Sequence, residues 1–206
     1  MVREPGPGAG GRRREQVRRI SEEAYTLADA VVVGSLLITL LRHSDRVKAA
    51  CVAQLVNTIS LIRSEPGGPA WRQATFHPFA LTARLARGNV LEVALQSPTY
   101  ETKQYGTVPL VDATATHDPA AGEVSIFLVN RSQAEPVRLE VDLRALPAVY
   151  TADALALSDS DLSATNTQDN PDRVQPRPLG AHVDGSVLRL ELPAVSWSCV
   201  RLFGRS

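Results

Sequence analysis

The feature of this sequence that most limits its fold is a change of hydrophobic pattern near residue 89. Before it, apolar residues recur at helical spacing, as in Leu27, Val31 and Leu41. After it, short apolar or alternating runs are separated by turn signals such as Asp118-Pro119. Many short strands at this spacing indicate a β-sandwich. The chain is therefore expected to be α/β up to residue 88 and all-β from residue 89.

The first part predicts a helix over Glu22–Arg42 and then a short strand, Val47–Ala53, whose small apolar residues suit burial on both faces. A second helix is expected over Ala70–Arg87 and should stop at Gly88. Pro78 inside that range predicts a kink or a split into two pieces. One strand between two helices cannot close a sheet by itself. The first part is therefore expected to be the end of something larger.

The second part contains seven runs with the composition of strands, and the polar stretch Ser158–Gly180 is expected to be a surface loop that crosses the sandwich. The expected strands are Val90–Leu95, Val108–Thr116, Glu123–Val129, Val137–Leu143, Tyr150–Leu157, Val187–Leu192 and Ser196–Phe203.

Charge and composition exclude some classes of partner. Residues 1–19 are rich in Gly, Pro and Arg and are interpreted as a flexible tail, although a basic arm for a partner is the alternative. Over the whole chain 22 basic residues balance 22 acidic ones, so no net charge attracts nucleic acid. The apolar run Ala28–Leu41 is too short to span a membrane. Neither nucleic acid nor membrane is an expected partner.

The cysteines and the N-terminus bear on the compartment. Cys51 and Cys199 lie in apolar runs without a metal-ligand spacing, which predicts two buried free thiols. Unpaired thiols favour a reducing compartment, and the N-terminus has no apolar segment typical of a secretory signal. The protein is expected to be cytoplasmic. The histidines share no metal-ligand spacing and no phosphate-binding loop occurs, so no metal and no cofactor are expected.

Seven segments carry a resemblance to a known family. Their order and approximate spacing resemble those of the α-L-arabinofuranosidases of glycoside hydrolase family 51, over about residues 18–206. The segments are YTLADAVVVG at 25–34, LLRHSDRVKAACVAQLVN at 40–57, EPGGPAWRQ at 65–73, SPTYET at 97–102, FLVNRS at 127–132, ATNTQDNPDRVQPRP at 164–178 and SWSCVRL at 196–202.

The resemblance implies the C-terminal end of a (β/α)8 barrel followed by a jelly-roll β-sandwich. Ala30–His43 would be the seventh barrel helix, Val47–Ala53 the eighth strand and Ala70–Arg87 the eighth helix. The resulting division is a flexible tail at 1–19, the last helix, strand and helix of the barrel at 20–88, and the C-terminal sandwich at 89–206.

The activity that the resemblance implies is the retaining hydrolysis of terminal non-reducing α-L-arabinofuranosyl residues in arabinan, arabinoxylan and their oligosaccharides. Such hydrolysis needs two carboxyl groups. The family carries them at the ends of the fourth and seventh barrel strands, upstream of the first residue that aligns here. No catalytic residue is therefore assigned, and the chain is expected to be inactive alone. A non-catalytic β-sandwich interaction module is the alternative.

The partners implied are an arabinose-containing oligosaccharide or polysaccharide, the missing barrel portion, and further copies of the chain, since intact relatives commonly form hexamers. One residue is a candidate for sugar binding. Gln54 directly follows the expected strand, and barrel enzymes place functional side chains at that position. An amide offers donors and an acceptor to vicinal hydroxyls. In the family the matching Gln contacts arabinose, while a loop-capping amide is the alternative.

Three further residues follow Gln54 in the sequence. Asn57 is expected to order the loop backbone, and Glu65 to be a solvated charge in the loop after the strand. Trp71 either packs in the interior or stacks on a sugar, and packing is the commoner outcome in an apolar context.

Overall fold

The computed structural model describes residues 22–146 and 150–204, so the predicted tail at 1–19 lies outside the described residues. None of the helices in this part of the chain is long and apolar enough to cross a membrane. The elements are α1 (Leu27–Arg42), β1 (Ile62–Ser64), β2 (Ala70–Arg72), α2 (Phe76–Leu85), β3 (Asn89–Leu91), β4 (Thr99–Thr102), β5 (Gly106–Pro109), β6 (Val111–Asp118), β7 (Glu123–Asn130), β8 (Val137–Asp142), β9 (Tyr150–Leu157), β10 (Arg177–Pro178), β11 (Ala181–Asp184), β12 (Val187–Leu192) and β13 (Ser196–Gly204).

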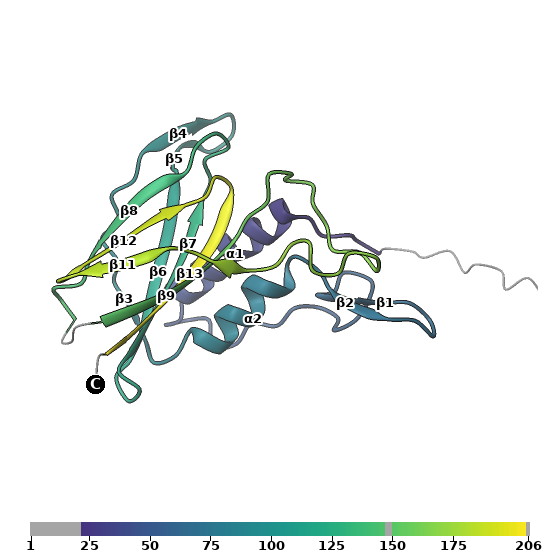
Figure 1. Ribbon diagram of the computed structural model, residues 1–206, viewed down its shortest axis with the longest axis horizontal. Helices are drawn as coiled ribbons and strands as arrows, with labels where there is room; N and C mark the ends of the chain where they lie inside the picture. Colours follow the sequence, from purple (N-terminus) through teal and green to yellow (C-terminus); the bar gives the residue numbers. More distant parts are fainter. Residues whose placement is uncertain (1–21, 147–149, 205–206) are drawn as a thin grey trace, which may run out of the picture.

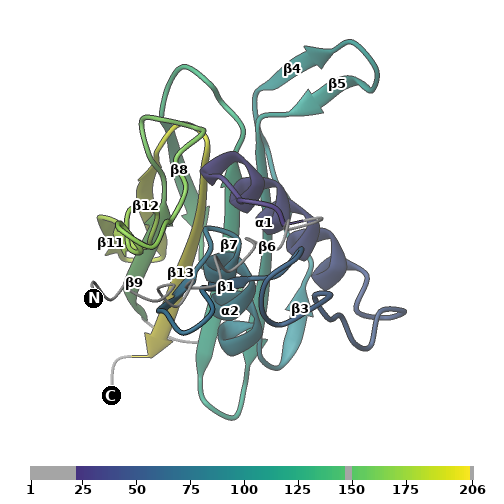
Figure 2. The same cartoon turned by 90° about the vertical axis from the view of Figure 1, so that its right-hand side faces the viewer.

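A six-stranded antiparallel sheet, in the order β10-β9-β13-β7-β6-β3, forms the centre of the molecule. One face packs against a three-stranded sheet, β11-β12-β8, and the other face carries the helices α1 and α2 (Figure 1). The fold is therefore mostly β, in three layers. The hairpin β4–β5 projects away from these layers (Figure 2).

The burial pattern of each strand follows from its layer. All residues of β7 from Val124 to Asn130 are buried, because the strand is covered on both faces. In β12, Leu188, Leu190 and Leu192 are buried and alternate with more exposed residues, because the outer sheet has one face in solvent. The continuous apolar run and the alternating run in the sequence are the signatures of these two environments.

Helix α1 packs on the six-stranded sheet along one stripe. Leu27, Ala30, Val31 and Ile38 are buried and join Trp197 in one core cluster. The helix is also held to the sheet by an ion pair between Arg42 and Asp112.

The buried Asp112 carboxylate at the start of β6 accepts a hydrogen bond from Arg131 at 2.7 Å and also pairs with Arg42 at the end of α1. The Arg131 guanidinium further donates to the Ser35 hydroxyl at 2.7 Å. The C-terminal turn of the helix is therefore tied to the sheet by charged groups as well as by apolar contact.

The predicted helix Glu22–Arg42 begins later than expected. It starts at Leu27 because Thr26 is an N-cap: its side chain accepts a hydrogen bond from the Asp29 amide, and the Asp29 carboxylate accepts one from the Thr26 amide. The signal Thr-x-x-Asp was present in the sequence.

The prediction of one helix over Ala70–Arg87 is wrong at its start. Ala70–Arg72 pairs with Ile62–Ser64 as a hairpin, and α2 begins only at Phe76. Pro78 lies in the first turn of α2, where its missing N–H group leaves no helical hydrogen bond unmade, so it causes no kink there. The helix ends at Leu85 with Ala86 as its C-cap, two residues before the predicted end at Arg87, and Gly88 then has the predicted left-handed conformation, with φ of 73°.

The prediction of a buried strand over Val47–Ala53 is also wrong. The segment belongs to none of the described strands, and residues 48–53 are exposed, including Cys51. A strand requires a hydrogen-bonded neighbour, and no described strand lies beside this segment. Cys199 is buried as expected, and burial raises the pKa of its thiol to about 11.

Most of the expected strands occur with shifts of a few residues at their ends. The range Val108–Thr116 is divided between β5 and β6, and the expected strand Val90–Leu95 shortens to β3. Short strands that the sequence did not indicate are β1, β2, β4, β10 and β11. Each is no longer than four residues and depends on its partner strand.

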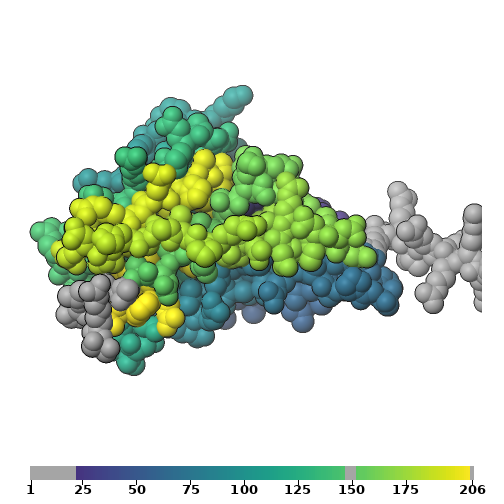
Figure 3. Space-filling view, viewed as in Figure 1, coloured from purple at the N-terminus to yellow at the C-terminus, as the bar shows by residue number. Residues whose placement is uncertain are grey.

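The polar stretch 158–180 is more than a surface loop. It runs over one face of the molecule (light green in Figure 3), above the segment that holds β1, β2 and α2 (blue). Ala164 and Val174 are buried in the same core cluster as α1, and Leu27 donates its amide hydrogen bond to the Ala164 carbonyl at 2.9 Å. The stretch therefore joins the sheet to the helical layer.

The contact between α1 and Trp197 gives a stability prediction. A Cβ atom on Gly34 would lie 2.1 Å from Trp197 Cδ1. Ala favours helix by about 1 kcal/mol over Gly, but overpacking costs about 1–3 kcal/mol. We expect Gly34→Ala to lower the free energy of unfolding by about 1–2 kcal/mol in urea denaturation. Gly180→Ala, where nothing lies within 4 Å, is the control and should change it by less than about 0.5 kcal/mol. Equal stability of the two variants would contradict the packing argument.

Candidate functional site

The predicted sugar-binding residue, Gln54, lies on an exposed segment between α1 and β1. Its backbone has φ of 51°, in the left-handed region. The side chain is open to solvent, so both its donors and its acceptor are accessible. This is a geometry in which an amide can bind a hydroxyl group.

The loop from Gln54 to Ser64 is strained and yet ordered by hydrogen bonds. Asn57 and Thr58 also have positive φ, 60° and 53°. Non-glycine residues rarely adopt this conformation, and each costs of the order of 1–3 kcal/mol. The loop closes on itself where the backbone N–H group of Asn57 donates to the Ile62 carbonyl at 2.8 Å.

The Asn57 side chain orders the backbone, as the sequence suggested. Its Oδ1 accepts a hydrogen bond from the Ser64 amide at 2.8 Å, and its Nδ2 donates to the Ser64 hydroxyl at 3.3 Å. Both groups of the amide are thus occupied within the loop.

A second amide, Gln73, connects the loop to the start of α1. It is 1% exposed. Its Nε2 donates to the Ser60 carbonyl at 2.7 Å, its Oε1 accepts from the Tyr25 amide at 3.0 Å, and its backbone amide donates to the Leu61 carbonyl at 2.8 Å. Gln73 was not predicted from the sequence, since a single glutamine near Trp71 gives no local signal of these distant partners.

Tyr25 closes the other side of the loop. Its hydroxyl donates to the Ile59 carbonyl at 3.3 Å. Burial raises the pKa of Tyr25, with smaller contributions from the nearby carboxylates Glu23 and Asp29. The phenol therefore remains a neutral donor at physiological pH.

Trp71 packs in the interior and is not available for stacking on a sugar. It is 8% exposed, and its indole N–H donates to the Asn166 carbonyl at 3.0 Å. The Arg63 guanidinium lies 5.7 Å from the centre of its ring. The Asn166 amide donates to the carbonyls of Arg72 and Val174, at 3.0 and 2.9 Å, and accepts from the Val174 amide at 2.7 Å. This network ties β2 to the stretch 158–180.

Two glutamates near the loop are held by structural contacts. Glu22 forms an ion pair with Arg63 at 2.9 Å, in which both side chains are mostly buried. Glu65 lies in the turn of the hairpin β1–β2, where its backbone bonds to Pro69 and Gly68. Within residues 22–146 and 150–204, no group of three or more His, Cys, Asp and Glu side chains is arranged to hold a metal ion.

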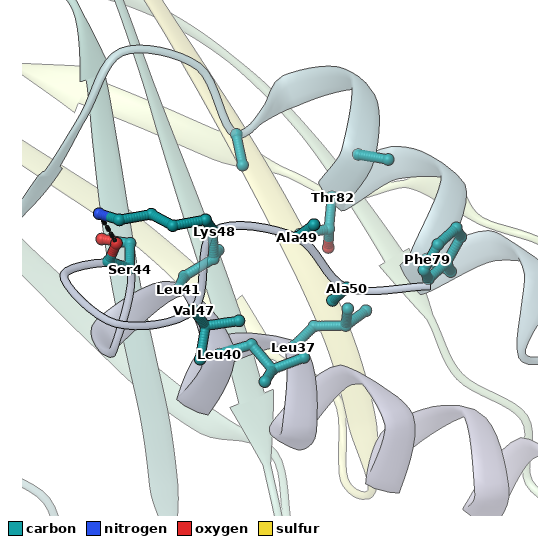
Figure 4. A pocket seen from close by; sticks show the side chains of 12 residues that line it. Leu37, Leu40, Leu41, Ser44, Val47, Lys48, Ala49, Ala50, Phe79 and Thr82 are labelled. Atoms are coloured by element: carbon teal, nitrogen blue, oxygen red, sulfur yellow. Dashed lines mark hydrogen bonds between the residues drawn. The ribbon is translucent and has the colours of Figure 1, made fainter. Parts of the chain in front are cut away.

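An apolar groove of about 220 Å³ lies between the two helices (Figure 4). The segment 47–50 passes over it, and Lys48 donates to the Ser44 carbonyl at 2.7 Å on one side. Leu37, Leu40 and Phe79 contribute large apolar side chains to its walls. Because it offers few polar groups, the groove suits apolar packing rather than sugar binding.

Comparisons with known proteins agree with this fold. The family model for the Alpha-L-arabinofuranosidase C-terminal domain matches residues 10–196. The chain is 48% identical over 188 residues to an intracellular exo-α-(1→5)-L-arabinofuranosidase of Streptomyces lividans, covering 89% of this chain and 28% of that protein.

Solved structures give the same result. A family 51 α-L-arabinofuranosidase of Bifidobacterium longum is 45% identical with a TM-score of 0.85, over 89% of this chain and 36% of that one. The family 51 arabinofuranosidase of Xanthomonas axonopodis pv. citri is 28% identical with a TM-score of 0.78, over 88% of this chain and 36% of that one.

The class of protein is thus the C-terminal domain of a glycoside hydrolase. The chain belongs to the α-L-arabinofuranosidases of glycoside hydrolase family 51. It spans about a third of the length of the relatives that it matches, between 28% and 37% of the length of each of six arabinofuranosidases.

The Asn166 network leads to a second stability prediction. Asn166→Ala would leave the Val174 amide and two carbonyl groups without their buried partner, and each unsatisfied group costs about 1–3 kcal/mol. We expect a loss of about 2–4 kcal/mol in the free energy of unfolding, measured by urea denaturation. Asn170→Ala, an exposed amide in the same stretch, is the control and should have little effect. A loss of less than about 1 kcal/mol for Asn166→Ala would show that water replaces the network.

Proposed function

We propose that this chain is the C-terminal part of an α-L-arabinofuranosidase. The whole enzyme would release terminal non-reducing α-L-arabinofuranosyl residues from arabinan, arabinoxylan and their oligosaccharides, with retention of configuration. Support comes from family membership and from the names of the relatives, which describe exo-acting α-(1→5)- and α-(1→6)-L-arabinofuranosidases. The names of several relatives, which call them intracellular, support the same compartment for this protein.

The proposed architecture assigns residues 20–88 to the end of a (β/α)8 barrel and residues 89–206 to a jelly-roll sandwich. The observation that carries the proposal is the apolar surface that the first part leaves uncovered. Val32 and Leu36, on the side of α1 away from the sheet, are 59% and 58% exposed. A helix that is apolar on both sides requires cover on both sides.

The segment 47–53 supports the same assignment. It is mostly apolar, exposed from residue 48 to 53 and outside the described sheets, as expected of a strand whose neighbours belong to another part of the enzyme. The remaining barrel elements would supply these strands. They would also supply the two carboxyl groups that retaining hydrolysis needs.

Gln54 is proposed to bind a hydroxyl group of the arabinosyl residue. Its exposed amide and the hydrogen-bonded loop beneath it support the role, because a fixed loop limits the entropy lost on binding.

A non-catalytic interaction module is the second candidate. It is favoured only if the exposed faces of α1 and of segment 47–53 bind some other protein. The module would not need the strained conformation of the Gln54 loop, whereas a sugar-binding site would use it.

The first test concerns activity of the chain alone. We expect the purified protein not to hydrolyse 4-nitrophenyl α-L-arabinofuranoside, because a single positioned acid–base group contributes about 10²- to 10⁴-fold to such rates. Release of nitrophenol is measured beside the Streptomyces lividans relative as a positive control. Turnover near the rate of that relative, in a preparation free of host glycosidase, would contradict the proposal.

The second test concerns Gln54 in a complete barrel. The chain is joined to the upstream portion of the Streptomyces lividans relative, with which it shares 48% identity. Gln54→Ala should lower kcat/KM by about ten- to a thousand-fold, corresponding to the loss of one or two hydrogen bonds worth roughly 1.5–4 kcal/mol in the transition state.

Gln104→Ala, an exposed amide on the projecting hairpin β4–β5, is the matched control and should leave kcat/KM unchanged. An inactive chimera that folds would favour the interaction module. An active chimera in which Gln54→Ala has no effect would assign Gln54 to loop structure alone.

A further inference from the structure

The strained backbone of the loop 54–64 must be stabilised by contacts with other segments of the chain. Three of its residues, Gln54, Asn57 and Thr58, have φ between 51° and 60° without being glycine. Thr58 is the least favourable of them, since a β-branched side chain crowds the left-handed conformation. A loop with this backbone persists only where surrounding contacts over-determine it.

Gln73 makes three of the hydrogen bonds that hold the loop from outside. Its side chain is buried and bonded at both ends, to Ser60 in the loop and to Tyr25 at the start of α1. Its own backbone amide holds Leu61. Gln73 thus connects the strained loop to the residues at the start of α1, and it does so beside the bonds from Tyr25 to the Ile59 carbonyl and from the Glu23 amide to the Thr58 carbonyl.

We propose that Gln73 is a positioning residue that holds the loop 54–64 in the conformation that presents Gln54 to the sugar. The link to sugar binding rests on the proposed function, whereas the hold on the loop is a property of this chain alone. Gln73 itself is buried and does not touch the substrate.

The chemistry of the two contacts is selective for an amide. Ser60 offers a carbonyl, which needs a donor, and Tyr25 offers an N–H group, which needs an acceptor. A protonated Glu side chain has the same shape and also carries one donor and one acceptor. An ionised Glu has only acceptors, so it would face the Ser60 carbonyl without a hydrogen bond.

The experiment uses Gln73→Glu in the full 206-residue chain. Amide exchange measured by NMR gives protection factors from pH 4 to pH 8 for Asn57, Ser64 and Gln73 or its replacement, whose N–H groups are bonded in or to the loop. We expect protection equal to that of the unsubstituted chain at pH 4 and at least tenfold lower at pH 8. Protection in β7 should not change.

The sign of this pH dependence follows from burial. A buried carboxyl group has a pKa above its unfolded value, so its contribution is fully present below the unfolded pKa and is lost as pH rises through the folded pKa. The unsubstituted chain, with Gln73, should lack the transition. If the side chain at position 73 only filled space, loop protection would show no such transition with pH, whether the residue is Gln or Glu.

Two further variants complete the design. Thr58→Gly added to Gln73→Glu should restore at least part of the protection at pH 8, because glycine adopts positive φ without strain. Gln54→Ala should leave protection unchanged, because that side chain is exposed.

Protection in the loop that is equal at pH 4 and pH 8 in Gln73→Glu would overturn the proposal. Loss of protection in β7 as well, or failure to fold at pH 4, would also overturn it, since Gln73 would then support the whole domain rather than the loop. If instead Gln54→Ala leaves hydrolysis by the chimera unchanged while the exchange results hold, only the sugar-binding role fails.

Discussion

The close packing of α1 on the six-stranded sheet is the constraint on which the other features depend. The central strands β7 and β13 are largely buried on both faces, so the sheet needs a layer on each side. Gly34 allows the helix to approach Trp197, and the ion pair of Arg42 with Asp112 ties its last turn to the sheet. Once the helix is placed, its first residues determine where the loop 54–64 is anchored, because Tyr25 is bonded to Gln73.

Two buried amides join segments that are distant in the sequence. Gln73 links the start of α1 to the loop, and Asn166 links β2 to the stretch that leaves β9. Each amide both donates and accepts within the protein, which is the condition under which a buried polar group stabilises a fold. The strained backbone around Gln54 is accordingly located beside a rigid network, a combination that is common at binding sites.

The surface of the domain has two different characters. The outer sheet β11-β12-β8 alternates buried and exposed residues and carries surface ion pairs such as Arg189 with Glu140. The helical layer instead exposes large apolar side chains, including Val32, Leu36 and Leu55. The first surface is suited to solvent and the second to another protein surface, in agreement with the proposed place of the chain in a larger enzyme.

Sequence alone determined the features that arise from local pattern. The continuous run of β7 and the alternation of β12 each depend on residues within a few positions of one another. The resemblance of seven ordered segments likewise identified the family. Tertiary structure decided what depends on distant partners. Ala70–Arg72 is a strand because Ile62–Ser64 pairs with it, and the segment 47–53 is not one because no described strand lies beside it. The roles of Gln73 and Asn166 could not be predicted, because a buried amide is defined by its hydrogen-bond partners, and theirs include residues 48 and 94 positions away.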